Sequence, residues 1–170
     1  SNSMDKIEKN KLFKELFSSF QTGIRSKKSV APRLFLESLG LDYQLLNIGF
    51  NSGQFHHRKS DEFKQQYSEI GVLTKSNAAV NKAGLTAYAC FGFESVVFPL
   101  KDRDNNIVNL FAIRFKLDST AELYLNENGL YPAVPQQQTK RIYLASTVVD
   151  AATLLQAGIP DMKETVLALR

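Results

Sequence analysis

Two apolar segments in the middle of the chain, separated by a short polar turn, constrain the fold more than any other feature. The first segment ends in SVVFPL at residues 95–100, and the second reads IVNLFAIRFK at residues 107–116. Between them lies KDRDNN, residues 101–106, whose Asp and Asn residues tolerate the backbone angles of a tight turn. This pattern predicts a β-hairpin at the centre of the fold.

Helical patterns dominate the chain before the hairpin. Apolar residues at helical spacing predict an amphipathic helix over residues 5–20. Further helices are expected over residues 30–39, which Gly40 terminates, over 42–46, which begins at Asp42, and over 60–70. The sequence TKSNAAVNKAGLT at residues 74–86 predicts a polar, mobile loop.

The chain after the hairpin predicts a strand, a linker and a strand–helix–strand unit. A short strand is expected over residues 122–126, and residues 131–139, with two Pro and three Gln, are typical of an extended linker. The last part predicts a buried strand, a helix and a final strand over 141–144, 148–156 and 165–169. This order implies a parallel pair of strands joined by a helix.

The predicted fold class is α+β, with N-terminal helices on a mostly antiparallel sheet followed by a βαβ unit. The Pro-rich and Gln-rich segment places a boundary near residues 135–140, which divides the chain into residues 4–138 and 139–170. Ser1-Asn2-Ser3 before Met4 is typical of residues added for expression. The apolar ending ETVLALR is typical of a cut inside a longer protein.

The amino-acid composition limits the classes of protein to which this chain can belong. The 170 residues are 44% hydrophobic, with 12 Phe and 6 Tyr, which suffices for a real core. No apolar run approaches the roughly 20 residues of a membrane span, and no signal peptide is visible, so we expect a cytoplasmic protein with no membrane partner. The net charge of +4 and the pI of about 9.1 permit nucleic-acid binding without establishing it.

Four short peptides appear in an order that is similar to one known family. They are Phe98-Pro99-Leu100, then Phe111-Ala112-Ile113-Arg114, then Leu123-Tyr124-Leu125-Asn126, and finally Ser146-Thr147-Val148-Val149-Asp150 leading into AATLLQAGI. This order resembles the catalytic core of bacterial-type DNA primases, the primase-like proteins that carry a CHC-type zinc finger and a Toprim domain. The resemblance implies a primase-like N-terminal subdomain over residues 4–138 and the start of a truncated, degenerate Toprim-like domain over 139–170. No zinc finger is seen in the sequence.

The resemblance also shows where this chain departs from the family's chemistry. Toprim domains hold Mg²⁺ with a Glu at the end of their first strand and an Asp pair on a later strand. Carboxylates suit this task because Mg²⁺ prefers hard oxygen ligands. Here Ser146 stands at the Glu position, Thr147 replaces a Gly, and the Asp pair would lie beyond Arg170. We therefore expect no catalysis and no metal or cofactor in this fragment, and Mg²⁺ only if the parent protein is an active nucleotidyltransferase.

Six residues are candidates for nucleic-acid binding through the resemblance. Arg114 corresponds to a family arginine that faces the template, and Tyr124 and Asn126 correspond to residues of the family's basic groove. Lys116, Lys140 and Arg141 would add charge near the same face. Each also has an ordinary interpretation: Arg114 is a surface arginine at a strand end, Tyr124 a half-buried strand aromatic, and the cations are solvated. Asp150 either matches a family Asp or complements the helix dipole from the first turn.

Two other reactive groups invite a chemical interpretation that the sequence disfavours. His56-His57 are adjacent, and adjacent strand residues point to opposite faces, so one metal ion cannot easily bind both. We expect one ring to pack beside Phe55 and the other to be exposed. Cys90, the single cysteine, lies among aromatic residues and reads as a core residue rather than a nucleophile.

The function that follows is a primase-like module gripping a single-stranded DNA template, with replication proteins such as a helicase as further partners. The alternative is a non-catalytic protein-interaction or scaffold domain of a mobile-element or replication protein, which the many substitutions favour. A third reading is an active primase in which another residue supplies the lost acid.

Overall fold

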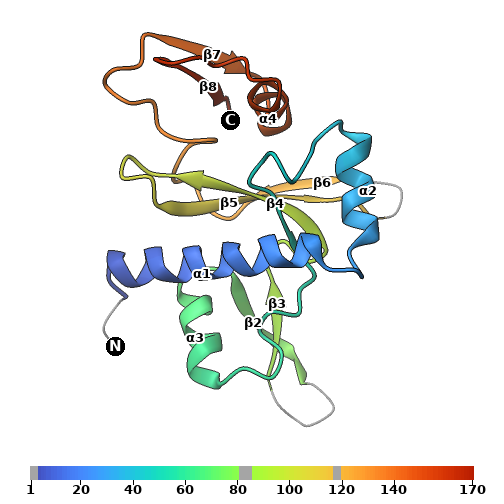
Figure 1. Ribbon diagram of the computed structural model, residues 1–170. Helices are drawn as coiled ribbons and strands as arrows, with labels where there is room; N and C mark the ends of the chain where they lie inside the picture. The colour runs from blue at the N-terminus through green and yellow to red at the C-terminus, as the bar shows by residue number, and fades with distance from the viewer. Residues whose placement is uncertain (1–3, 81–85, 117–119) are drawn as a thin grey trace.

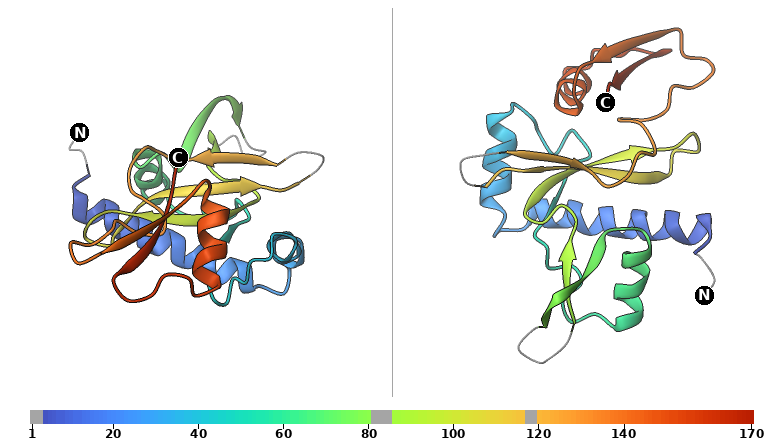
Figure 2. Two further views of the ribbon diagram at one scale, coloured as in Figure 1. Left: turned by 90° about the horizontal axis from the view of Figure 1, so that it is seen from above. Right: turned by 180° about the vertical axis from the view of Figure 1, so that it is seen from behind.

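The protein has three layers in the computed structural model, which describes residues 4–80, 86–116 and 120–170. A four-stranded antiparallel sheet in the order β1-β4-β5-β6 forms the middle layer (Figure 1). The long helix α1 crosses one side of it, with α3 and the β2–β3 ribbon beyond that helix, and the β7-α4-β8 unit lies on the other side (Figures 1 and 2). The predicted α+β class is therefore confirmed.

The elements follow the chain in this order, with their bounds: α1 (Lys6–Arg25), α2 (Val30–Ser38), β1 (Gly49–Asn51), α3 (Asp61–Glu69), β2 (Leu73–Val80), β3 (Thr86–Cys90), β4 (Ser95–Lys101), β5 (Ile107–Arg114), β6 (Ala121–Tyr124), β7 (Arg141–Ala145), α4 (Val148–Gln156) and β8 (Glu164–Ala168). In the described part of the chain, no helix is both long and apolar enough to span a membrane.

Helix α1 begins at a side-chain cap and continues further than the sequence predicts. The Asp5 carboxylate accepts a hydrogen bond from the Glu8 N–H at 2.8 Å, which satisfies one of the free donors of the first turn. The predicted end at residue 20 is too early, because Ile24 extends the apolar stripe by one more turn and is fully buried. The helix crosses β1 closely: a Cβ on Gly49 would lie 2.5 Å from the Phe20 Cβ.

The central strands β4 and β5 are buried on both faces. One face, with Val97, Leu110 and Ala112, packs against the aromatic side of α1. The other face, with Phe98 and Phe111, belongs to a core that also contains residues of α4 and β8. Because both faces of these strands are buried, their sequences are continuous apolar runs rather than an alternation of apolar and polar residues.

The predicted hairpin turn is confirmed, and Asp102 organises it. Its carboxylate Oδ1 accepts hydrogen bonds from the backbone N–H groups of Asp104 at 2.9 Å and Asn106 at 3.0 Å. Asn105 adopts a positive φ of 66°, which Asn tolerates better than most residues.

Two local predictions are wrong. Residues 42–46 form a single hydrogen-bonded turn, in which the Leu45 and Leu46 N–H groups both point to the Asp42 carbonyl, and no helix follows. The loop predicted at 74–86 is wrong for residues 74–80, which belong to β2 and pair with β3. Backbone pairing in a two-stranded ribbon needs no apolar side chains, so polar composition hides such a strand. Residues 81–85 of that loop lie outside the described residues.

The C-terminal βαβ unit is confirmed, including its parallel pairing, in which Tyr143 lies opposite Val166. The prediction that β7 is a buried strand is wrong, because the side chains of Ile142 and Leu144 are 44% and 63% exposed. Helix α4 covers only one face of the strand pair, the face that carries Ala145 and Val166. The division of the chain at residue 138 stays a prediction.

Candidate nucleic-acid interface

Arg114 and Lys116 lie together at one end of the central sheet. Arg114 is the last residue of β5, and its exposed guanidinium lies 5.7 Å from the centre of the Phe93 ring. Lys116 pairs with Glu94 at 2.7 Å, in the turn between β3 and β4. Because Glu94 offsets the charge of Lys116, Arg114 is the stronger anion-binding group of the two at this end.

Tyr124 ends β6 on the opposite face of the sheet. It stands opposite Phe111 in the strand register, and the two ring centroids are 4.8 Å apart. The Arg170 guanidinium lies 4.8 Å from the centre of the Tyr124 ring. Burial raises the pKa of the Tyr124 hydroxyl, and the nearby Arg170 charge opposes that rise. The Tyr124 ring and the Arg170 cation therefore lie side by side, at the edge of the contact between the central sheet and the βαβ unit.

Arg170 is held in place by the backbone that follows β6. Its Nη2 donates hydrogen bonds to the carbonyl oxygens of Asn128 at 2.7 Å and Gly129 at 3.2 Å. The residue lies two positions after β8, where the Ala168 N–H donates to the Tyr131 carbonyl and the Leu169 N–H donates to the Ala145 carbonyl. Sequence reasoning missed this arginine, because nothing in ETVLALR indicates that its last residue meets a tyrosine 46 positions earlier (170 − 124).

Asn126 has a structural role in this fold. Its amide Nδ2 donates to the Val108 carbonyl at 3.0 Å, and its Oδ1 accepts from the Asn128 N–H at 2.8 Å. The fully buried Asn109 completes the arrangement, because its amide donates to the carbonyl oxygens of Asn126 and Asn128 and accepts from the Asn126 N–H. This asparagine cluster fixes the loop to which Arg170 is bonded.

Lys140 and Arg141 lie at the start of β7, away from the residues above. The Arg141 guanidinium pairs with Glu164 at 3.2 Å and approaches the Tyr143 hydroxyl at 3.4 Å. Lys140 is exposed, and its backbone N–H bonds to the Lys163 carbonyl at 2.6 Å. Lys140 and Arg141 lie at the amino end of the parallel β7–β8 pair, whereas Arg170 lies at its carboxyl end.

Ser146 and Asp150 lie close together where β7 meets α4. Ser146 is exposed directly after the strand, and the Thr147 hydroxyl caps the helix by accepting from the Asp150 N–H at 3.0 Å. Asp150 is exposed in the first turn, where its charge complements the helix dipole. Among residues 4–80, 86–116 and 120–170, no three His, Cys, Asp or Glu side chains gather as a metal ion would require.

The six predicted binding residues thus fall in separate places instead of one trough. The strand register puts Arg114 on the α1 face of the sheet, two residues from Ala112, and Tyr124 on the βαβ face. Lys140 and Arg141 lie on the βαβ unit itself. The structure brings Tyr124 together with Arg170, which was not predicted. The binding roles of the six remain predictions.

The histidine pair and the cysteine match their ordinary interpretations in burial, but the expectation that the two histidine side chains point to opposite faces is wrong. The pair lies in a turn rather than a strand, and its ring centroids are 4.8 Å apart. His56 is buried with its ring 5.3 Å from Phe55, and His57 is exposed. Burial, followed by the charges of His57 and Lys64, lowers the pKa of His56. Cys90 is partly buried against the Asn51 amide, and burial raises the pKa of its thiol. A thiol with a raised pKa is a poor nucleophile at neutral pH.

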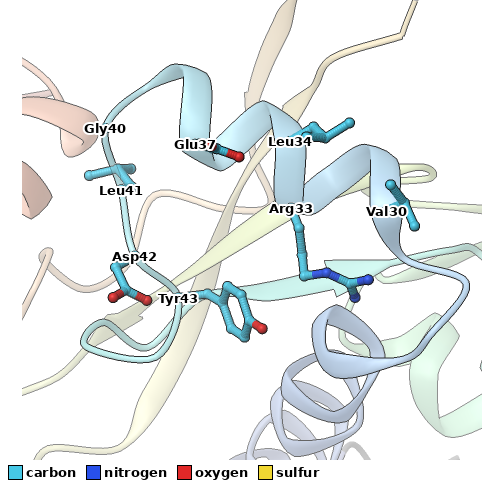
Figure 3. Close-up of a pocket in the computed structure, with 8 residues that line it drawn as sticks. All are labelled: Val30, Arg33, Leu34, Glu37, Gly40, Leu41, Asp42 and Tyr43. Carbon is cyan, nitrogen blue, oxygen red and sulfur yellow. The ribbon is translucent and has the colours of Figure 1, made fainter.

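A hollow lies between α2 and the turn that follows it (Figure 3). It has a volume of about 510 Å³, with the exposed Val30 and Leu34 on one wall and Asp42 and Tyr43 opposite. Arg33 does not reach into it as a free cation, because its Nη1 donates to the carbonyl oxygens of Ile24 and Ser26. The hollow is shallow and has no set of converging polar groups that would do chemistry.

Comparison with known proteins identifies the fold. No family model matches the sequence, and no curated protein matches it significantly. Among solved structures, a DnaG primase catalytic domain bound to single-stranded DNA covers 96% of this chain at a TM-score of 0.75 and 19% identity. A DNA primase domain from Pseudomonas aeruginosa covers 94% at 0.74 and 17% identity. The RNA polymerase domain of Mycobacterium tuberculosis primase DnaG, in complex with double-stranded DNA, covers 96% at 0.68 and 12% identity.

The chain spans about half of those structures, between 53% and 55% of their lengths. It has the fold of the corresponding part of a bacterial-type primase catalytic core. The likeness rests on the three-dimensional arrangement rather than on the sequence, because fewer than one residue in five is identical in the first of them.

Proposed function

We propose that this chain is a primase-like module that binds single-stranded DNA. The observation that carries the proposal is the fold likeness over 96% of the chain to a primase catalytic domain that itself holds single-stranded DNA. The basic pI of about 9.1 and the exposed cations on both faces of the central sheet agree with a partner that carries phosphates.

Tyr124 and Arg170 are the residues on which we base the contact. A nucleic-acid base stacks on an aromatic ring or a guanidinium plane, and a guanidinium also donates two parallel hydrogen bonds to a phosphate. Here the two groups lie 4.8 Å apart, and the arginine is oriented by two carbonyl oxygens. Arg114, on the other face, would contact a strand that passes around the open edge formed by β6.

The proposal is tested by fluorescence anisotropy with a labelled oligothymidylate at low and moderate salt. We expect micromolar binding that weakens as salt rises, because phosphate contacts release counterions. Tyr124→Ala should weaken binding about 5- to 100-fold, the usual loss of one stacked base. Arg170→Gln should weaken it more than Lys75→Gln, which removes the same charge from an exposed side chain of β2. Absence of binding at low salt would end the proposal.

We also propose that this chain has no polymerase activity of its own. At the position where the resemblance places a metal-binding Glu, Ser146 offers only a neutral hydroxyl, and the carboxylate of Asp150 lies in the first turn of the helix that follows. This donor set does not fit Mg²⁺, which favours carboxylate oxygens together with substrate phosphates. A primer-synthesis assay with template, nucleoside triphosphates and Mg²⁺ should give no product, and a template-dependent product would overturn this point.

One observation favours a second function, a protein-interaction or scaffold domain. The outer face of β7 leaves Ile142 and Leu144 exposed, and Leu169 after β8 is 48% exposed. Exposed apolar side chains gathered on one element mark interaction surfaces more often than chance. The same anisotropy titration separates the two functions, because a scaffold domain without nucleic-acid binding would leave the oligonucleotide free even at low salt.

A further inference from the structure

A second hollow lies between the first half of α1 and the hairpin that joins β4 to β5. It has a volume of about 480 Å³. Three lysines and three asparagines supply its polar lining, and Ile107 supplies an apolar part: Asn10, Lys11 and Lys14 from α1, and Lys101, Asn105 and Asn106 from the hairpin. The two elements are about ninety positions apart in the sequence, so folding alone brings these groups together.

The positive charge of this hollow is not offset locally. Within the described residues, no carboxylate lies within 4.0 Å of the ammonium groups of Lys11, Lys14 or Lys101. The two acids of the hairpin lie nearest to Lys6 rather than to the lysines of the hollow, although the buried Oδ2 of Asp102 makes no hydrogen bond. Asp102 accepts from the backbone of its own turn, and both Asp102 and Asp104 face Lys6, at 3.9 and 3.6 Å.

The amide groups of the hollow also have donor capacity to spare. In the part of the chain that the structure describes, the side chains of Asn10, Asn105 and Asn106 make no hydrogen bond. The positive φ of Asn105 and the hydrogen bond from the Asn106 N–H to Asp102 fix the backbone of both hairpin residues. Their carboxamides are therefore held on a rigid turn beside three ammonium groups.

We propose that this hollow binds a phosphate group. Ammonium groups are donors only, and a phosphate offers several strong acceptor oxygens and two negative charges. Charge-assisted hydrogen bonds to phosphate are the stronger class, and several from one rigid pocket add up. The phosphate comes either from a free nucleoside triphosphate or from the backbone of a nucleic acid. The inference goes beyond the proposed function, because triphosphate binding here requires nothing of Tyr124 or Arg170.

The adjoining surface extends the same chemistry along α1. A neighbouring hollow of about 330 Å³ shares Asn10 and is lined by Lys9 and Asn126, but also by Glu69 and by Lys6, whose charge Asp102 and Asp104 partly offset. Asn126 thus faces Lys9 across this hollow, although its own amide is engaged with the backbone. A polyphosphate or a short stretch of backbone would reach from one hollow to the next.

The test is a titration of the ¹⁵N-labelled chain with sodium triphosphate, followed by amide chemical shifts. We expect the shifts to cluster at residues 10–14 and 101–107. The double variant Lys11→Gln/Lys14→Gln should weaken binding about tenfold, as expected for the loss of charge-assisted hydrogen bonds. The matched control Lys27→Gln/Lys28→Gln removes two exposed charges near the other end of α1 and should change affinity less than about twofold. Thermal unfolding checks that both variants fold.

A second arm identifies the source of the phosphate. If an oligothymidylate competes with triphosphate and loses affinity in the Lys11→Gln/Lys14→Gln variant, the hollow binds a nucleic-acid backbone. If the oligothymidylate does not compete with triphosphate and keeps its affinity in the variant, the hollow binds a free phosphate compound. Triphosphate that shifts no signals in the hollow, or an equal loss in the two double variants, would overturn the site. Failure of the proposed function appears separately: the oligonucleotide does not bind at low salt, while triphosphate still shifts the signals of the hollow.

Discussion

The central antiparallel sheet and the C-terminal parallel pair are built from similar residues but are buried to different extents. Strands β4 and β5 are covered on both faces, by α1 on one side and by the βαβ unit on the other. Strands β7 and β8 are covered by α4 on one face only, so Leu144 is 63% exposed while Phe98 is fully buried. Apolar character alone therefore does not locate the core, because burial depends on which second layer is available.

The comparison is tested most strongly by truncating one side chain from each sheet. Phe98→Ala removes a ring that contacts Phe111 and Tyr131 at centroid distances of 6.1 and 5.8 Å. We expect a loss of about 3–5 kcal/mol in the free energy of unfolding, because a cavity forms in a doubly covered layer. Leu144→Ala, the matched control, should cost less than about 0.5 kcal/mol, as for other surface changes. Urea unfolding measures both, and equal losses would contradict the comparison.

A smaller loss of stability is expected at Asn109, one of the buried polar residues of the central sheet. Asn109 is fully buried, and its side chain makes hydrogen bonds to the backbone of Asn126, Asn128 and Leu110. Asn109→Ala leaves those backbone groups without partners and should lower stability by about 1–3 kcal/mol. Because the loop that holds Arg170 depends on this cluster, oligonucleotide affinity should fall as well. If the variant folds fully and binds the oligonucleotide with unchanged affinity, the loop does not contribute to the binding surface.

The smallest expected effect is on the pH dependence of the free energy of unfolding. It comes from His56, which lies outside both sheets. Its pKa lies below the ordinary value of 6.5 because burial disfavours the protonated ring. The unfolded chain therefore binds the proton more readily, and stability should decrease as pH falls from about 6.5 toward the lowered folded-state pKa. Above that pH range, His56 does not make the free energy of unfolding depend on pH. The free energy of unfolding measured between about pH 5 and 7.5 should depend less on pH in His56→Gln than in the natural sequence, and an unchanged dependence would contradict the assignment.

Local sequence patterns predicted most of the secondary structure but little of the candidate site. The apolar spacing in α1, the Asp-rich turn at 101–106 and the strand–helix–strand order near the end are all local signals, so the sequence carried them. The polar strand β2 was missed, because its hydrogen bonds come from the partner strand and not from its own composition. Arg170 was missed for a similar reason, since its significance comes from a tyrosine on another strand.

The amino-acid sequence by itself determined the α+β class, the central hairpin and the parallel βαβ ending. Tertiary structure alone decided which cations meet which aromatic and amide groups. The strand register put Arg114 and Tyr124 on opposite faces, and chain folding brought Lys11 and Lys14 to the hairpin that carries Lys101. The physical reason is that helix and strand periodicities act over a few residues, whereas a binding surface depends on contacts between elements far apart in the chain.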